Sequence, residues 1–214
     1  MRYSKEHKQE THARIVRKAS VRLREKGAHG VGVADLMKEA GLTHGGFYAH
    51  FDSRDALLIE AFAHAMDRST ERWRKTLGET APERRLSAMV ENYLTPAHRD
   101  DPGQGCTVPA LSADIARESP KTRKAFAAKL EQMIDMMAEQ IPDVPRKTAR
   151  KQAAATLATM MGTLVLARVA GSGEFSDDIL AAGRDAALGR LAAAGSGGGK
   201  AAAKKAGKGA SARH

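Results

Sequence analysis

Cys106 is the side chain of this sequence whose type and position suggest covalent chemistry. It is the only cysteine of the 214 residues, and it stands between Gly103-Gln104-Gly105 and Pro109. Because proline is tolerated in the first turn of a helix, we expect the sulfur near a helix N-terminus, where the dipole favours thiolate over thiol. His98 and Arg99 would add positive charge if the loop folds back. Electrophile and oxidant sensors use such an exposed thiolate, whereas a lone cysteine can equally be a small buried core residue.

A catalytic role for the cysteine has little support. It could be drawn as a nucleophilic triad with His98 and one of three acids, Asp100, Asp101 or Asp114. Proximity in sequence, however, does not establish the geometry that a triad needs. The sequence has no glycine-rich phosphate loop before a helix. Two histidines, His7 and His12, lie close together near the N-terminus, but the sequence contains no Cys–His cluster that could bind a metal. We therefore expect no enzyme, no metal site and no cofactor.

A second group of chemically suggestive residues lies in the stretch 42–51, Leu-Thr-His-Gly-Gly-Phe-Tyr-Ala-His-Phe. A short amphipathic segment, residues 33–40, precedes it, and Gly41 suits the left-handed conformation that ends a helix at a sharp turn. We expect the Thr43 hydroxyl to cap the next helix by accepting a backbone N–H. Two short helices joined by such a turn are typical of a helix-turn-helix, whose second helix enters the DNA major groove.

The composition of this second helix fits a backbone that approaches DNA closely. Gly45 and Gly46 leave room for phosphate, although each costs about 1 kcal/mol relative to alanine inside a helix. Leu42 and Phe51 are expected to pack beneath the helix as a platform. The polar or aromatic tips that could touch DNA are those of Thr43, His44, Tyr48 and His50.

The pattern Ala40-Gly41-Leu42-Thr43-x-Gly45-x-Phe47-Tyr48-x-His50-Phe51 resembles the DNA-binding signature of TetR-type transcriptional repressors. The flanks agree, since residues 15–27 resemble the first helix of that family and residues 53–58 the fourth. The resemblance covers about residues 8–66. One departure is Gly32, where the family usually places a Ser or Thr cap, but glycine is a tolerated cap. The alternative is a generic amphipathic helix pair.

The resemblance implies roles for individual side chains. Thr43, Tyr48, His50 and Arg54 would contact backbone phosphates, and His44, Gly46 and Phe47 would face base edges. His44 can donate to guanine, and Phe47 could pack on a thymine methyl. Because these contacts are few, DNA shape should share in specificity. The shorter pattern Gly105-Cys106-x-x-x-Ala110-Leu111 resembles the branch of the family that responds to N-ethylmaleimide, quinones and reactive aldehydes, which implies sensing by Cys106.

The charge distribution favours a polyanionic partner. The net charge is +10, and residues 1–50 hold ten Lys and Arg against five acids, while residues 195–214 hold five Lys and Arg and no acid. Basic ends around a nearly neutral middle favour nucleic acid over an acidic small substrate. No uninterrupted apolar run approaches membrane-spanning length and no secretory signal is visible, so we expect a cytoplasmic protein associated with the bacterial nucleoid.

Helical periodicity and few aromatic residues predict an all-α protein of about nine helices. Helices are expected over 10–26, 33–40, 53–77, 82–93, 109–118, 120–141, 145–170 and 176–193, with 95–109 the longest irregular stretch. We expect a helix-turn-helix DNA-binding domain over 1–54 and a helical effector-sensing and dimerisation domain over 55–194. Methionines such as Met133 and Met160 could line a ligand cavity there or simply pack the core. Residues 195–214 should form a disordered basic Lys/Ala/Gly tail.

The last two helices, 145–170 and 176–193, are the candidate homodimer interface, by analogy with the resembled family; a buried core helix within one chain is the alternative. In the run 153–170, Gly162 would allow close backbone approach. The expected protein is a transcriptional regulator that represses from a palindromic DNA operator as a dimer and is released by a small-molecule or electrophile effector. The rivals are a nucleoid-type architectural DNA binder that uses the basic tail and a thiol enzyme that uses Cys106.

Overall fold

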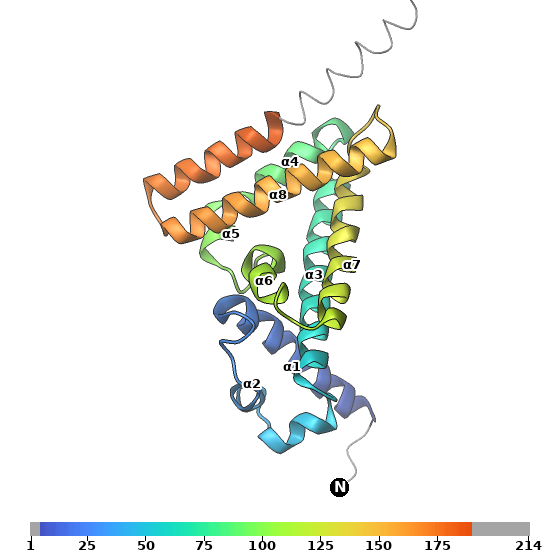
Figure 1. Cartoon of the computed structure of the whole chain (residues 1–214), viewed down its shortest axis with the longest axis vertical. Coiled ribbons are helices and arrows are strands. Elements are labelled where there is room, and N and C mark those ends of the chain that lie inside the picture. The colour runs from blue at the N-terminus through green and yellow to red at the C-terminus, as the bar shows by residue number, and fades with distance from the viewer. Residues whose placement is uncertain (1–4, 190–214) are drawn as a thin grey trace, which may run out of the picture. The chain divides into compact units, whose positions relative to one another are not determined.

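The computed structural model describes residues 5–189, and regular secondary structure in that range is helical, as the sequence predicts (Figure 1). The chain forms two compact units. Unit 1 contains the residues up to Lys75 together with Ala97–Glu131, and unit 2 contains Thr76–Pro96 and the residues from Gln132 onward. The basic stretch 195–214, for which we predicted disorder, lies outside the described residues.

Unit 1 is built on two long helices, α1 (Lys5–Lys26) and most of α3 (Arg54–Glu79). Helix α1 buries Ile15, Ala19 and Leu23 as one apolar stripe, and it packs against α2 (Val33–Glu39) and α6 (Thr107–Ile115). It begins at Lys5 rather than at the predicted Glu10, because the Lys, Glu and Gln side chains of residues 5–9 are good helix formers that need no buried partner.

The predicted turn after α2 is confirmed. Gly41 has a φ of +75°, the left-handed conformation that glycine adopts without strain. The next element, η1 (His44–Ala49), is a 3₁₀ helix rather than an α-helix. Its hydrogen bonds run from Gly46 N to Thr43 O at 3.0 Å and from His50 N to Phe47 O at 2.9 Å. Two adjacent glycines disfavour the α-helical form, and so short an element tolerates the tighter winding.

The stretch 95–109, which we expected to be irregular, contains helix α5 (Pro96–Asp100). A proline at the first position of a helix loses no intrahelical hydrogen bond, so Pro96 starts the helix rather than preventing it. A tight loop follows, in which Gln104 N donates to Asp101 Oδ1 at 3.0 Å. Helix α6 then begins, and after it α7 (Pro120–Ala138).

Unit 2 contains η2 (Pro82–Arg84), α4 (Arg85–Tyr93), α8 (Arg146–Ala170), the end of α7 and a helix over 174–189. Helix α8 and the helix over 174–189 pack so closely that a Cβ at Gly183 would lie 2.2 Å from Thr163 Cγ2. The close approach predicted for the run 153–170 is found at Thr163, whereas a Cβ at Gly162 would meet nothing within 4 Å in this chain. Periodicity places a glycine on a helix face but does not show which neighbour lies opposite.

By length and composition alone, α8 could cross a membrane, since one window of 18 residues has a mean hydropathy of 1.5. The sequence analysis missed this property because threonines interrupt the apolar residues of the helix. The signal is weak, as 44% of the window is buried inside the molecule and core helices of soluble proteins pass the same test.

Candidate DNA-binding surface

Element η1 presents most of the side chains that the sequence predicts to touch DNA. Thr43, His44 and Gly45 are exposed, and Tyr48 is 70% exposed. Thr43 occupies the N-cap position of η1, but its hydroxyl forms no cap hydrogen bond, so the predicted side-chain cap is wrong. The carbonyl of Thr43 accepts from Gly46 N instead, and the hydroxyl remains available to another partner.

Phe47 is the residue that seats η1 on the rest of unit 1. Its side chain is 2% exposed, and its ring stacks on Phe51 with the centroids 5.4 Å apart. The Tyr48 ring meets it edge to face at 5.3 Å. In this structure the Phe47 ring is buried, so the implied contact with a base edge would require the ring to leave the core. The edge-to-face contact with Phe47 helps to orient Tyr48.

His50 closes η1 and is half-buried. Its Nδ1 is buried and has no hydrogen-bond partner among residues 5–189. Burial, followed by the charges of His12 and Lys8, lowers the pKa of His50, so the ring is neutral at pH 7. His12, which the sequence analysis did not connect with this surface, stacks on Phe51 at 4.5 Å and places Nε2 2.6 Å from Glu60 Oε2. The tautomer with its proton on Nε2 gives His50 a donor for a phosphate oxygen.

The start of α1 adds basic side chains that the sequence analysis missed. A shallow groove of about 420 Å³ is lined by Lys5, Lys8, Gln9 and His12, and Lys8 is close enough to His50 to affect its pKa. The available signal was the pair of lysines at i and i+3, Lys5 and Lys8, at the start of the helix.

Arg54, predicted as a phosphate contact, makes its contacts within unit 1. Its Nη2 donates to Ala28 O, and its Nη1 lies 3.7 Å from Glu118 Oε1. The Glu118 side chain is only 10% exposed, and the same oxygen lies 3.3 Å from His29 Nε2. Neither contact of this oxygen is a hydrogen bond, although both are within ion-pair distance. A DNA phosphate would therefore compete with Glu118 for Arg54.

The loop between α1 and α2 joins Arg54 to helix α6. Ala28 N donates to Asp114 Oδ2 at 2.8 Å, on the opposite side of the peptide chain from Arg54. Gly30 is the residue that this loop requires, because a Cβ there would lie 1.9 Å from Lys26 O. Asp114 of α6 and Arg54 of α3 thus hold the backbone of the same residue, Ala28.

Cys106 is the N-cap of α6, close to the predicted position, but its side chain is only 2% exposed. The loop folds back as expected, since Cys106 N donates to His98 Nε2 at 2.9 Å. This hydrogen bond needs a lone pair on Nε2, so His98 is neutral and adds no positive charge, contrary to our expectation. Arg99 turns to Asp100, with Nε and Oδ1 2.7 Å apart. A reagent could reach the sulfur only after the loop moves.

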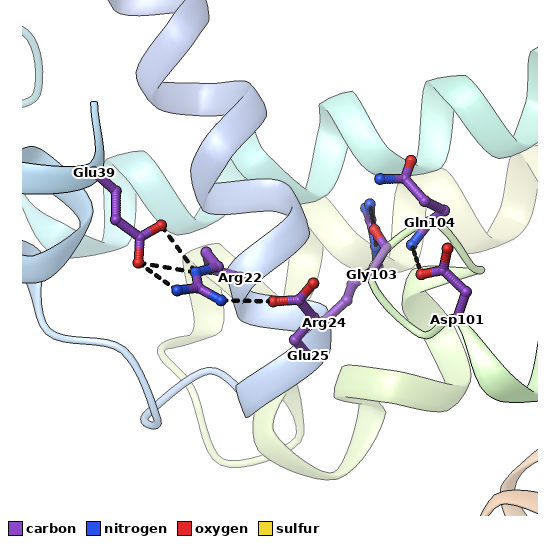
Figure 2. A network of polar contacts seen from close by, with 7 residues as sticks. All are labelled: Arg22, Arg24, Glu25, Glu39, Asp101, Gly103 and Gln104. Carbon is purple, nitrogen blue, oxygen red and sulfur yellow. Dashed lines mark hydrogen bonds and ion pairs between the residues drawn. The ribbon is translucent and has the colours of Figure 1, made fainter. Parts of the chain in front are cut away.

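A polar network ties α1 to the helix-turn-helix and to the loop 101–105 (Figure 2). Arg22 Nε donates to Glu39 Oε1 at 2.9 Å, at the end of α2, and Arg22 Nη1 donates to Glu25 Oε2 at 3.0 Å. The Arg22 guanidinium holds the pKa of Glu39 below its usual range. Two residues further along α1, Arg24 Nε donates to Gly103 O at 3.0 Å.

An exposed element after a tight turn, seated on buried aromatic rings and bordered by basic side chains, is the arrangement of a helix-turn-helix DNA-binding protein. The sequence matches the family model of bacterial regulatory proteins of the tetR family over residues 15–61. Residues 82–180 match the model for the C-terminal domain of LmrA/YxaF-like transcriptional regulators. The chain belongs to the TetR family of helix-turn-helix transcriptional regulators.

Known proteins agree with this assignment. An uncharacterised HTH-type transcriptional regulator of Mycobacterium tuberculosis is 28% identical over 164 residues, which cover 73% of this chain and 83% of the relative. A TetR regulator of Chloroflexus aurantiacus has a similar fold, with a TM-score of 0.70, 23% identity and coverage of 84% of this chain and 94% of its own. The reduced form of Escherichia coli NemR gives a TM-score of 0.69 at 21% identity, over 82% of this chain and 96% of its own.

Proposed function

We propose that this regulator is a homodimeric repressor that binds a pseudo-palindromic operator and is released by a small-molecule or electrophile effector. The observation that carries the proposal is the exposure of Thr43, His44, Gly45 and Tyr48 on one short element, held in place by the buried Phe47. Exposed polar side chains on an element that is held by buried packing can enter a DNA groove in a fixed orientation. Such a regulator works in the cytoplasm, at the nucleoid.

Each of these residues has a distinct proposed contact. Thr43, Tyr48 and His50 donate to phosphates, and the small residues Gly45 and Gly46 let the backbone approach the DNA. His44 reads a base edge, with guanine its best partner. Arg54 adds a phosphate contact once it leaves Glu118, while Phe47 supports the surface from below. The DNA-binding part remains assigned to residues 1–54 and the effector and dimerisation part to 55–194.

The proposed dimer uses α8 and the helix over 174–189. The exposed large apolar side chains of this pair are Val165 (38%), Leu166 (60%), Val169 (81%) and Phe175 (72%). An exposed apolar patch in a folded unit is typical of a protein interface. The predicted interface range 176–193 extends past the described residues. Replacing Leu166 and Val169 with Glu should leave helical content intact and convert a dimer to a monomer in analytical ultracentrifugation; a dimer that persists would exclude this interface.

Cys106 is the proposed point at which an electrophile acts. Its position as N-cap of a helix favours thiolate character, and its burial means that sensing would require an opening of the loop 101–106. Cys106→Ser should bind operator normally and fail to release it when treated with N-ethylmaleimide. Release of DNA by the treated variant would show that the cysteine is not the sensor.

Selection of bound sequences from a random duplex library, with purified protein at moderate salt, tests the proposed function. The expected result is a palindrome whose half-sites lie about one helical turn apart, roughly 34 Å. Tight binding without a motif would contradict the repressor and favour the architectural DNA binder, for which removal of residues 195–214 should abolish most of the affinity.

A further inference from the structure

Rows of basic side chains occur on the two long helices of unit 1, and the charges of the two rows affect one another. On α1 the stripe consists of Arg17 and Arg24, seven residues apart, and on α3 it consists of His64, Arg68 and Arg72, spaced by four residues. Each stripe therefore follows one face of its helix. Arg24 is buried at 6% exposure, whereas Arg17, Arg68 and Arg72 are exposed, so the two rows form a basic strip with a buried end.

The loop after α5 brings the two stripes together. Arg24 Nε donates to Gly103 O at 3.0 Å, and Arg72 Nη1 donates to the next carbonyl, Gln104 O, at 2.8 Å. Figure 2 shows Arg24 reaching this loop from α1. A Cβ at Gly103 would lie 2.7 Å from Glu25 Oε1, which shows how closely the loop lies against α1. Consecutive carbonyls hold Arg24 and Arg72 side by side.

The acids near this strip are engaged elsewhere. Asp101 accepts from Gln104 N at 3.0 Å, Asp67 pairs with Lys129, and Glu25 pairs with Arg22. In the part of the chain that the structure describes, no hydrogen bond or ion pair joins Arg17 or Arg68 to a carboxylate. The strip therefore carries more cationic than anionic groups.

The titration behaviour of two members reflects this imbalance. Burial, which is the largest cause, and the charges of Arg72 and Arg68 lower the pKa of Arg24 to about 10, whereas Cys106, whose effect exceeds that of Arg68, and Asp101 raise it. Burial and then Arg68, Arg17 and Arg24 lower the pKa of His64, against the opposing charge of Asp67. The Nε2 of His64 is buried and has no hydrogen-bond partner among residues 5–189. A buried polar atom without a partner, beside uncompensated cations, is typical of a site that completes its hydrogen bonds with a ligand.

We infer that Arg17, Arg68 and His64, backed by Arg24 and Arg72, bind a small anion of phosphate or carboxylate chemistry. The anion accepts from the two exposed guanidinium groups and offsets the repulsion within the strip; His64 Nε2, which is buried, donates to it only after a local movement exposes this atom. Binding favours the imidazolium form of His64, so affinity increases as the pH falls toward the ordinary pKa of histidine. The inference does not depend on operator binding.

The test measures binding of inorganic phosphate and, separately, of succinate to the full-length protein by calorimetry, at an ionic strength held constant with chloride. At least one of the two anions should bind saturably, with one site per chain. Binding of phosphate or of succinate then shows whether the site prefers a phosphate or a carboxylate. The Arg17→Gln/Arg68→Gln double variant should weaken binding at least tenfold. Both side chains are exposed, and circular dichroism checks that the variant folds.

Arg74→Gln is the matched control, since Arg74 is an exposed arginine of the same helix that pairs with Glu71 outside the strip. It should leave the affinity unchanged. In NMR titrations of the His64 ring, the bound anion should raise the pKa of His64 by about one unit or more. Absence of saturable binding of both anions, an unmoved His64, or equal loss in the Arg74 variant would each overturn the inference.

Discussion

His50 shows how the environment of one side chain limits what it can contribute to DNA binding. Burial and the neighbouring charges of His12 and Lys8 lower its pKa, and its Nδ1 is buried without a partner in residues 5–189. A proton on Nδ1 would therefore be an unsatisfied buried donor, and Nε2 is the atom left to donate to phosphate.

This assignment predicts different outcomes for two amide substitutions. The amide nitrogen of Gln reaches the position of Nε2, so His50→Gln should keep operator affinity within about threefold of the original protein, whereas His50→Asn should lose roughly one hydrogen bond, about fivefold. Fluorescence anisotropy with a labelled operator measures both. Equal loss in the two variants would contradict donation from Nε2.

Phe47 and Tyr48 are adjacent in sequence and should separate stability from DNA binding. Phe47→Ala removes a ring that is 2% exposed and should lower the free energy of unfolding by about 3–5 kcal/mol. Tyr48→Phe changes only a hydroxyl on a side chain that is 70% exposed, so thermal melting should be unchanged while operator affinity falls. If Phe47→Ala melted like the original protein, its role as the seat of η1 would be wrong.

At the scale of elements, Glu118 links the end of α6 to the start of α3. It lies 3.7 Å from Arg54, and Asp114 holds the Ala28 backbone that Arg54 also binds. Movement of α6 would therefore change how available Arg54 is to DNA. Ser53 caps α3, with Ala56 N donating to Ser53 Oγ at 3.1 Å, so the start of this helix is fixed.

Glu118→Gln removes the competing charge and should raise operator affinity several-fold. The slope of log affinity against log salt should also increase by about one, because one more phosphate contact forms. Arg54→Gln should abolish both effects, and Arg54→Gln/Glu118→Gln should behave like Arg54→Gln alone. Anisotropy titrations between 50 and 200 mM salt measure these differences, and an unchanged slope in Glu118→Gln would contradict the competition.

Substitution of alanine for Gly183 and for Gly162 gives a matched pair of variants within unit 2. A Cβ at Gly183 would lie 2.7 Å from Thr163 Cβ, which cannot rotate away, so Gly183→Ala should destabilise by about 1–3 kcal/mol. A Cβ at Gly162 meets nothing within 4 Å, so Gly162→Ala should stabilise by up to about 1 kcal/mol through helix propensity. Urea denaturation of both variants tests the packing; equal effects would contradict it.

The helices and the turn were predictable because helical periodicity and Gly41 are local properties of the sequence. The 3₁₀ form of η1 and helix α5 were missed because short elements depend on what they pack against. The burial of Cys106, the acceptor role of His98 and the Arg54–Glu118 contact depend on segments more than forty residues apart or on loop geometry, for which the sequence carries no periodic signal. Phe47 was predicted to face base edges, and only packing could show that its ring is buried.

At the scale of the whole molecule, the proposed dimer would hold two DNA-binding surfaces at a fixed separation. In that proposal, the exposed Leu166, Val169 and Phe175 form the surface on which two chains associate, and η1 makes the DNA contact of each chain. A dimer of this kind measures the spacing of half-sites as well as their sequence.

The most direct test is therefore operator affinity after about five base pairs, half a helical turn, are inserted between the two half-sites. The insertion moves the half-sites to opposite faces of the duplex without changing their sequence. For a dimer that binds both half-sites together, affinity for the operator should fall at least a hundredfold. The affinity of the protein for one isolated half-site should not change, because the sequence of the half-site is unchanged. Affinity that is unchanged by the insertion would contradict a dimeric operator-binding regulator and would favour independent or sequence-blind binding.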